Sequence, residues 1–246
     1  MLMGLTFKDE IMIHTRAERL RTVRPSSTGS AMTRLVRTLE WPTTVPAADH
    51  WLETSRTPEA GIGHLDAAAA LGRDPFKSEV RLWMEKTGRQ DLLHPAQLED
   101  ESLTYWHRLL DPIVAAHYPL RTGRKLRQLN ATLQHPEHPW MFATVTREVV
   151  ASPDVQLLEC LCVGMHVAPL WAHGVPQDIR LRVLHLLAVT GMRAADVVAL
   201  LGGQDLQIYR IERDEAEIAR LIRAERAFWN AVELDQAPAA RDQDRD

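Results

Sequence analysis

A single carboxylate interrupts an apolar run in the second half of the chain. Glu159 lies inside Val155–Val163, which follows Pro153 and ends before Gly164, and such a run is typical of a buried β-strand. A buried carboxylate is costly unless a cation pairs with it or a metal ion binds it. The sequence therefore predicts that Glu159 either belongs to a metal site or pairs with a basic side chain.

Other residues of metal-binding type are present, but their spacing favours structural roles. Cys160 and Cys162 lie two residues apart, so on a strand they share one face, and small buried thiols are favoured over metal ligands or a disulfide. His135 and His138 lie beside prolines with no third ligand in view, which favours a turn over a metal site. The chain has no Gly-rich phosphate loop followed by Lys-Ser/Thr and no serine elbow.

The composition is that of a globular protein with an ample core. The chain has 246 residues, of which 45% are hydrophobic and 25% are charged. Its formal net charge of −4 does not mark a nucleic-acid binder, although basic patches such as Arg121–Arg127 can set the local field. Charged residues at Lys8–Glu10 argue against a secretory signal, and no apolar run approaches the ~18 residues of a membrane span. We expect a cytoplasmic protein with no membrane partner.

The elements that must position these residues change type along the chain. Residues 1–30 are expected to form a flexible extension and 236–246 a disordered tail, which leaves 31–235 as one domain. Apolar periodicity predicts helices at about 78–88, 102–117, 177–190 and 214–234, and strands at about 125–133, 142–151, 155–163, 197–201 and 206–211. This order predicts an α/β (α+β) fold with a mixed central sheet of about five strands flanked by helices.

Several segments, taken together and in order, resemble the YqaJ-type viral recombinases. These are phage and prophage nucleases similar to lambda exonuclease, within the PD-(D/E)xK nuclease superfamily. The resemblance implies a restriction-endonuclease-like fold for this chain. The matching segments are Trp51-Leu52-Glu53, Gly61-Ile62-Gly63, Asp66-Ala67-Ala68, Ala70-Leu71-Gly72, Leu82-Trp83, Glu85-Lys86-Thr87-Gly88, His135–Met141, Trp171, Gly174-Val175-Pro176, Leu187–Gly191, Leu201-Gly202-Gly203, Tyr209, Arg213-Asp214-Glu215 and Phe228-Trp229.

The resemblance implies a phosphodiesterase in which carboxylates hold Mg²⁺ or Mn²⁺. The family's helix glutamate falls on Asp111, its strand aspartate on Thr146, the glutamate of its Glu-x-Lys motif on Glu159 and the lysine on Leu161. Two of these four positions have lost their chemical character and a third is shortened. Asp111 and Glu159 are the remaining catalytic and metal-binding candidates, so metal binding is expected to be weak or absent.

The resemblance also implies a set of residues that seat the DNA phosphate, namely Arg56, Asp66, Arg147 and Arg182. His64-Leu65 replaces the Gly-Ser of the family's upstream segment, and Arg182 replaces a glutamine. Arginines beside the former metal site would favour holding a phosphate over cutting it. Alternatively the two arginines form ordinary salt bridges, for instance with Glu148, Asp154 or Glu159, and a pair of Arg182 with Glu159 would explain how the buried carboxylate tolerates the loss of a metal. Trp140 and Trp171 are candidates for stacking on a base.

Three functions remain open from the sequence. The first is a pseudonuclease that still binds double-stranded DNA or DNA ends. The second is an active metal-dependent exonuclease whose ligands have migrated to Asp66, Glu148 or Asp154, with Arg147 or Arg182 as the cation. The third is a protein-binding decoy or regulator of a host defence or recombination enzyme. The resemblance further implies a trimeric homo-oligomer and a single-strand annealing protein as partner.

Overall fold

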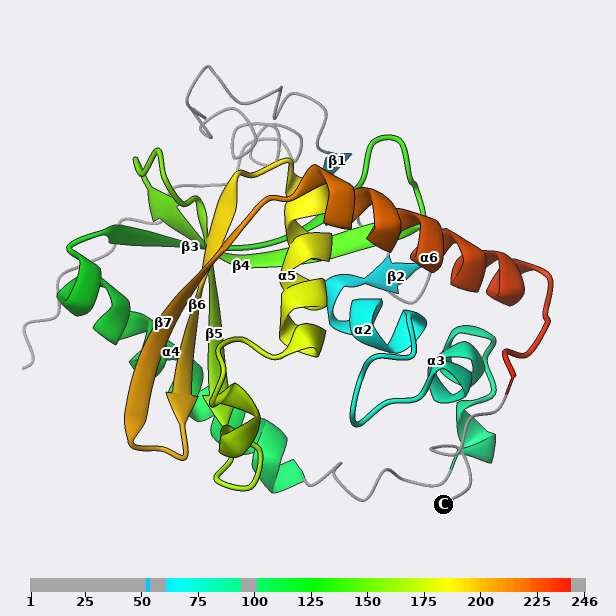
Figure 1. The fold of residues 1–246 in the computed structure, drawn as a ribbon, viewed down its shortest axis with the longest axis horizontal. Helices are drawn as coiled ribbons and strands as arrows, with labels where there is room; N and C mark the ends of the chain where they lie inside the picture. Colours follow the sequence, from blue (N-terminus) through cyan, green and yellow to red (C-terminus); the bar gives the residue numbers. More distant parts are fainter. Residues whose placement is uncertain (1–51, 54–60, 94–100, 240–246) are drawn as a thin grey trace, which may run out of the picture. The chain divides into compact units, whose positions relative to one another are not determined.

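The computed structural model describes residues 52–53, 61–93 and 101–239, and for residues 52, 53 and 101–105 it describes the backbone alone (Figure 1). The predicted extension 1–30, Arg56 and residues 240–246 of the predicted tail lie outside the described residues. All described residues belong to one compact unit, Trp41–Asp246. No helix among them is long and apolar enough to cross a membrane.

A mixed seven-stranded sheet organises this unit, with the strand order β1-β3-β4-β5-β6-β7 and β2 paired to β4. The five longer strands confirm the predicted sheet: β3 (Lys125–Gln134), β4 (Met141–Val150), β5 (Leu157–Val163), β6 (Ala194–Leu201) and β7 (Asp205–Glu212). The two short strands, β1 (Leu52–Glu53) and β2 (Ile62–Gly63), were not predicted. Of the pairings, β5 with β6 and β2 with β4 are parallel and the others are antiparallel.

Helices cover both faces of the sheet (Figure 1). On one face, α5 packs against the sheet together with α2 and α6; on the other face lies α4. The helices are α2 (Ala67–Ala70), α3 (Glu79–Lys86), α4 (Glu101–Thr122), α5 (Gln177–Thr190) and α6 (Glu215–Glu233), and the 3-10 helices are η3 (His64–Asp66), η4 (Gln90–Leu92) and η5 (Ala168–Trp171).

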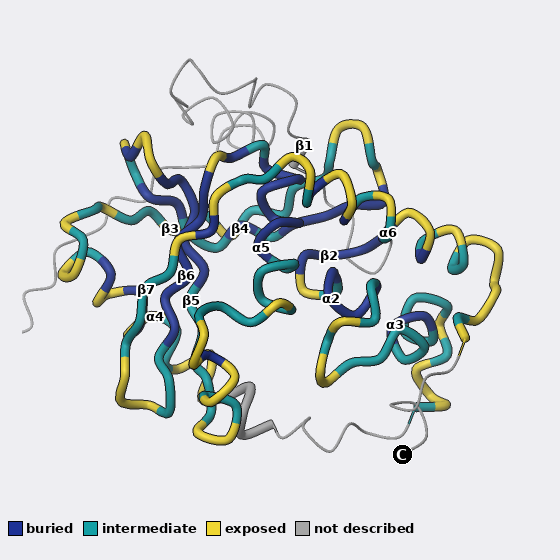
Figure 2. The backbone as a smooth tube through the Cα atoms, viewed as in Figure 1, coloured by how far each residue is buried: buried dark blue, intermediate teal, exposed yellow. Residues whose placement is uncertain are grey.

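The main core lies between α5 and the sheet, as the buried segments of Figure 2 show. All residues of α5 from Val183 to Thr190 are buried, because this helix is covered by the sheet, α2 and α6. The helix ends at Gly191, whose φ of 67° is the left-handed conformation that glycine adopts easily. A smaller core joins α4 to the sheet through Val114, Tyr118, Leu158 and Val198.

The edge of β4 that faces β5 is paired over only part of its length. Backbone partners are Arg147 with Leu158 and Glu148 with Leu157, whereas Met141 and Phe142 pair with β2 instead. The segment between these pairings includes Thr146. β4, which carries Thr146, therefore separates from β5, which carries Glu159, and the predicted site lies where the two strands part.

Four details differ from the sequence prediction. The strand of Glu159 begins at Leu157, and only its first half is fully buried. The helix predicted to stop at residue 117 continues past Pro112 and Pro119 to Thr122. Trp140 and Trp171 are 6% and 4% exposed, so neither ring offers a face to a base. The large apolar side chains of α4 do not share one buried face, because several of them are exposed.

Candidate functional site

Glu159 is paired with a guanidinium rather than open to a metal ion. Its side chain is 5% exposed, and Arg182 Nη2 on α5 donates to Glu159 Oε2 at 2.6 Å. This is the salt bridge with Glu159 that the sequence suggested for Arg182. A buried carboxylate on a strand thus obtains its cation from the facing helix, which satisfies the requirement set by its burial.

Asp111, the second surviving carboxylate, is also held by an arginine. Arg147 on β4 donates from Nη1 to Asp111 Oδ1 at 3.0 Å and from Nη2 to Oδ2, which is a two-pronged contact. Burial alone would lower the pKa of Arg147, but the hydrogen bond to Asp111 and the nearby negative groups raise it overall. The predicted partners Glu148, Asp154 and Glu159 were therefore wrong for Arg147, whose hydrogen-bonded partner is Asp111.

The other two positions of the predicted site, Thr146 and Leu161, have neutral side chains. Thr146 is partly buried on β4, and Leu161 packs against the main core. Leu161 also lines a pocket of about 340 Å³ together with Leu65, His107, Arg108, Asp111, Cys160, Cys162 and Arg182. The pocket therefore joins α4, β5 and α5 around the predicted site, and its basic side chains are Arg108 and Arg182.

The two cysteines in this pocket are protonated thiols at neutral pH. Burial raises the pKa of Cys160 to about 12 and also raises the pKa of Cys162, with the charge of Asp111 adding to both shifts. A thiol must lose its proton to act as a nucleophile or as a metal ligand. Cys160 and Cys162 therefore serve as small packing residues against α4, as the sequence favoured.

A buried histidine adjoins the site. His64 is 7% exposed, and its Nδ1 accepts a hydrogen bond from the Thr144 amide at 3.4 Å. Burial, with the charges of Arg182 and His185, lowers the pKa of His64 well below its ordinary value, so the ring is neutral. The sequence identified position 64 as a departure from the family motif, but it gave no signal that this imidazole fills the space between β4 and α5.

The proposed replacement ligands are all paired elsewhere. Lys86 Nζ lies 2.8 Å and Lys77 Nζ 3.4 Å from the carboxylate of Asp66. Glu148 pairs with Arg127 at 2.6 Å, and Asp154 lies 3.8 Å from Arg124. Asp66 therefore fastens η3 to α3, and its part in seating a phosphate stays a prediction, as do those of Arg147 and Arg182.

The donor set does not fit a divalent cation. Mg²⁺ prefers anionic oxygen ligands in a near-octahedral arrangement, but both carboxylates here face guanidinium groups, and the other two positions are a hydroxyl and an alkyl chain. Within residues 61–93 and 106–239, no three His, Cys, Asp or Glu side chains form a group that could hold a metal. The predicted loop pair of His135 and His138 is structural, since His135 Nδ1 accepts from the amides of Glu137 and His138.

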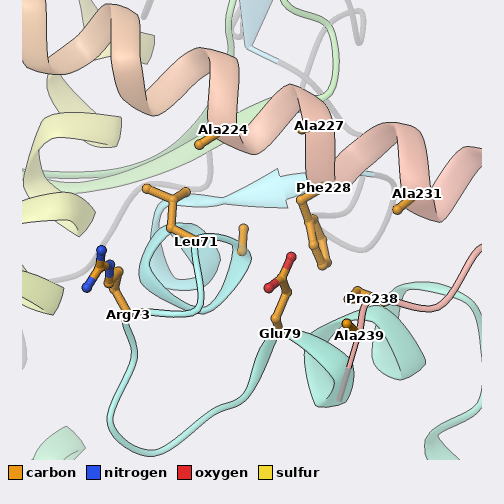
Figure 3. A pocket seen from close by; sticks show the side chains of 10 residues that line it. Leu71, Arg73, Glu79, Ala224, Ala227, Phe228, Ala231, Pro238 and Ala239 are labelled. Carbon is orange, nitrogen blue, oxygen red and sulfur yellow. The ribbon is translucent and has the colours of Figure 1, made fainter. Parts of the chain in front are cut away.

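A larger pocket of about 660 Å³ lies among α2, α3 and α6 (Figure 3). Its lining is mostly apolar, with Leu71 and Phe228 beside several alanines, and the charged Arg73 and Glu79 border it. None of the predicted site residues lines it. It carries no group of residues that suggests chemistry, and the candidate site remains the pocket at Asp111 and Arg182.

The fold resembles that of a solved exonuclease. An alkaline exonuclease (LHK-Exo) from Laribacter hongkongensis matches with a TM-score of 0.58 and 18% identity, over 72% of this chain and 90% of that chain. The same enzyme in complex with dAMP matches with a TM-score of 0.58 and 19% identity, over the same shares of the two chains. At this identity the likeness establishes the arrangement of the sheet and helices.

Residues 50–193 match the YqaJ-like viral recombinase domain, and the chain belongs to that family. A relative described as uncharacterized protein YqaJ from Bacillus subtilis (strain 168) is 34% identical over 195 residues. The match covers 78% of this chain and 58% of that relative, so this chain spans little more than half of the relative's length.

Proposed function

We propose that this chain binds double-stranded DNA, at or near DNA ends, without cleaving it. One observation carries the proposal: each carboxylate that remains at the former metal site is neutralised by an arginine of this chain. Glu159 pairs with Arg182 and Asp111 pairs with Arg147. The positive charge that the family obtains from a metal ion is here supplied by side chains.

Loss of cleavage follows from the chemistry that the site no longer assembles. Hydrolysis of a phosphodiester needs an activated water and stabilisation of the charge that builds on the phosphate. Thr146 and Leu161 bring neither a metal ligand nor a cation, and residues that act as one catalytic unit fail together. The neutral His64 lies beside Arg182, but it does not supply a base through Nδ1. That nitrogen already accepts a hydrogen bond from the backbone of β4.

Retention of DNA binding is supported by the basic groups that line the pocket. Arg182 uses Nη2 for Glu159, but its side chain is 24% exposed and lines the pocket. Arg108 is exposed at the other side of the same pocket. Guanidinium groups bind phosphate through several donors, and such contacts position a duplex without reading its sequence. The LHK-Exo relative is described as an exonuclease, which favours DNA ends as the ligand.

A paired cleavage and binding measurement tests the proposal. Linear duplexes with blunt and recessed ends are incubated with the full chain in Mg²⁺ or Mn²⁺, with Glu159→Gln as the matched control. We expect no cleavage above that control, and binding in EDTA that weakens as salt rises. Metal-dependent cleavage that Glu159→Gln abolishes would establish an active nuclease. Affinity weaker than about 10⁻⁴ M at physiological salt would remove the DNA-binding part.

A further inference from the structure

β7 is the last strand of the sheet, and one of its edges carries no partner strand. It pairs with β6 along all 8 of its residues, Asp205–Glu212, and it ends the strand order of the described sheet (Figure 1). Within residues 61–93 and 101–239, no strand pairs with its other edge. Such an edge presents unpaired N–H and C=O groups, to which a strand of another chain can add.

The hydrogen bonds to β6 fix which residues of β7 face this free edge. The Arg213 amide donates to Arg193 O at 2.8 Å, and these two residues lie opposite each other in the register that pairs Ala194 with Glu212. Hydrogen-bonded and non-hydrogen-bonded positions alternate along an antiparallel pair. The odd-numbered residues of β7 therefore bond to β6, whereas the even-numbered residues turn their N–H and C=O groups outward. These outward residues are Leu206, Ile208, Arg210 and Glu212.

β7 lacks the features that usually prevent edge pairing. It contains no proline, and its register with β6 runs without a bulge. The charge nearest its centre is neutralised within the chain, because Arg210 Nε donates at 2.9 Å to the buried carboxylate of Asp196 on β6. The same carboxylate accepts from the Tyr118 hydroxyl on α4 at 2.6 Å. The free edge is therefore long and regular, with no unpaired charge at its centre.

The charges near its ends make β7 complementary to a second copy of itself. In an antiparallel pair of two such strands, outward residues oppose outward residues, so the allowed registers differ by two residues. When Tyr209 lies opposite its own counterpart, Asp205 of each strand lies opposite Arg213 of the other. The next register places Arg210 opposite itself in one direction and Asp205 opposite Ile211 in the other. Opposite charges stabilise a cross-strand pair and like charges destabilise it, which selects the first register.

We infer that two copies of this chain pair through β7, with the strands antiparallel and Tyr209 at the two-fold axis. The pairing joins the two sheets into one and satisfies the outward backbone groups of both strands. Each copy contributes the same residues, as in any interface with two-fold symmetry.

The contacts that the two end charges make within one chain do not oppose this pairing. Asp205 accepts from Gln207 Nε2 at 2.7 Å. Arg213 Nε pairs with Glu215, whose side chain is 75% exposed. Both contacts join near neighbours at the surface, where ionic and polar pairs contribute little to stability. The side chains can therefore exchange them for the cross-strand pairs.

Sedimentation equilibrium of the full chain tests the pairing. We expect a dimer with a micromolar dissociation constant. Glu212→Pro removes an outward N–H at both ends of the paired strands but no bond to β6, so it should weaken the dimer about tenfold or more. Glu212→Ala is the matched control, since it retains the N–H and should leave the dimer intact. Circular dichroism verifies the fold, and Asp205→Lys, which places like charges opposite each other, provides a second variant if Glu212→Pro unfolds the chain.

Oxidative cross-linking tests the register. Two copies of Tyr209→Cys should form a disulfide-linked dimer, because position 209 faces its counterpart in a non-hydrogen-bonded pair, where side chains are closer. Gln207→Cys should not, because its counterpart lies about 14 Å further along the strand. The unmodified chain, with Cys160 and Cys162, measures the background.

Four outcomes would overturn the inference. The first is a monomer at the highest soluble concentration, and the second is a trimer, which would assign the assembly to another surface. The third is a dimer that both Glu212→Pro and Asp205→Lys leave intact. The fourth is cross-linking of Gln207→Cys in place of Tyr209→Cys, which would show that the strands do not meet in the register that the charges select.

Discussion

At the scale of single residues, two arginines define what this site has become. Arg182 on α5 pairs with Glu159, and Arg147 on β4 pairs with Asp111. The two pairs differ in burial: Glu159 is 5% exposed, whereas the side chain of Asp111 is 37% exposed. Solvent therefore screens the second pair but not the first, and their contributions to stability should differ accordingly.

Arg182→Ala should destabilise the fold by about 3–5 kcal/mol, because it leaves a buried carboxylate without a cation. Urea denaturation measures this, and the double variant Arg182→Ala with Glu159→Gln should recover part of the loss. Arg147→Ala should cost no more than about 1 kcal/mol, since Asp111 can be hydrated. An unchanged urea midpoint in Arg182→Ala would contradict the importance of the buried pair.

His64 should make stability depend on pH below neutrality. Burial and the charges of Arg182 and His185 lower the pKa of His64 in the folded chain, so between that value and about 6.5 the unfolded chain binds more protons. The stability due to the neutral ring is therefore complete above pH ~6.5 and is lost as the pH falls toward the lowered pKa. We expect a smaller loss between pH 7.5 and 5 in His64→Gln than in the unmodified chain.

The exposed His117 offers the matched control for this measurement. His117→Gln removes an exposed imidazole by the same substitution, so it measures what a His-to-Gln change does away from the buried site. His135 contributes in the same direction, because burial and the charge of His138 lower its pKa to about 4. An identical loss of stability in His64→Gln and the unmodified chain would show that His64 is not the group that titrates.

Of the two arginine–carboxylate pairs, the sequence predicted the pair of Arg182 with Glu159. Glu159 stands alone in an apolar strand, so a cation was required, and Arg182 was a candidate because the family resemblance placed it near the site. The partner of Arg147 was missed because Asp111 is 36 positions away in the sequence. It lies on α4, and the packing of α4 against β5 cannot be derived from local sequence patterns. Closer carboxylates in the sequence were chosen instead, but Glu148 pairs with Arg127 on the neighbouring strand.

At the scale of the elements, the chain at Gly61 and β2 lies close against the start of β4. Ile62 donates its amide to Trp140 O at 2.7 Å, which brings the preceding Gly61 against the same strand. A Cβ on Gly61 would lie 2.4 Å from Trp140 O and 2.5 Å from the Phe142 ring. Glycine is required here by the close backbone contact, and η3 with His64 follows directly after β2.

Gly61→Ala should therefore destabilise the fold by about 1–3 kcal/mol, because the carbonyl that it meets is fixed in the sheet. The change in urea midpoint measures the effect. Gly164→Ala is the matched control: its nearest atom, at 3.0 Å, belongs to the exposed side chain of His166, which can move away. Equal midpoints for the two variants would mean that β2 can shift relative to β4 without cost.

The longer elements could be predicted because each repeats one period over many residues. The strands β3 to β7 and the helices α3 to α6 appear near their expected positions, and Ser78 caps α3 by accepting from the Arg81 amide at 3.1 Å. β1 and β2 have two residues each, too few for any period to show. The end of α4 was placed too early because His117 precedes Pro119, and proline usually ends a helix.

At the scale of the whole molecule, the positive charge of the site comes from two side chains of the protein, Arg147 and Arg182. Its stability should therefore not depend on divalent ions, since a ligand stabilises a fold only if the folded state binds it. We expect millimolar Mn²⁺ to leave the melting temperature of the unmodified chain unchanged. The variant Thr146→Asp with Arg147→Gln and Arg182→Gln exposes three carboxylates, and Mn²⁺ should raise its melting temperature by several degrees, roughly the effect of 1 kcal/mol.

A rise of the same size in the unmodified chain, absent from Glu159→Gln, would show that a cation competes successfully with the arginines. The absence of a rise in the triple variant would show that the strands hold these three positions too far apart. Binding of duplex DNA in EDTA is a companion measurement on the same samples. It separates the phosphate contacts of the basic side chains from any contribution of a metal.

The hydroxyl that anchors α4 has an optical consequence. Burial and the bond to Asp196 raise the pKa of Tyr118 above its ordinary value of 10.0, so this phenol keeps its proton in alkali while α4 stays in place. The chain has 3 tyrosines, and phenolate absorbs in the near ultraviolet where phenol does not. In an alkaline titration the absorbance of the Tyr118 phenolate should therefore appear last, when α4 detaches from the sheet. This absorbance reports the contact between α4 and the sheet without a label.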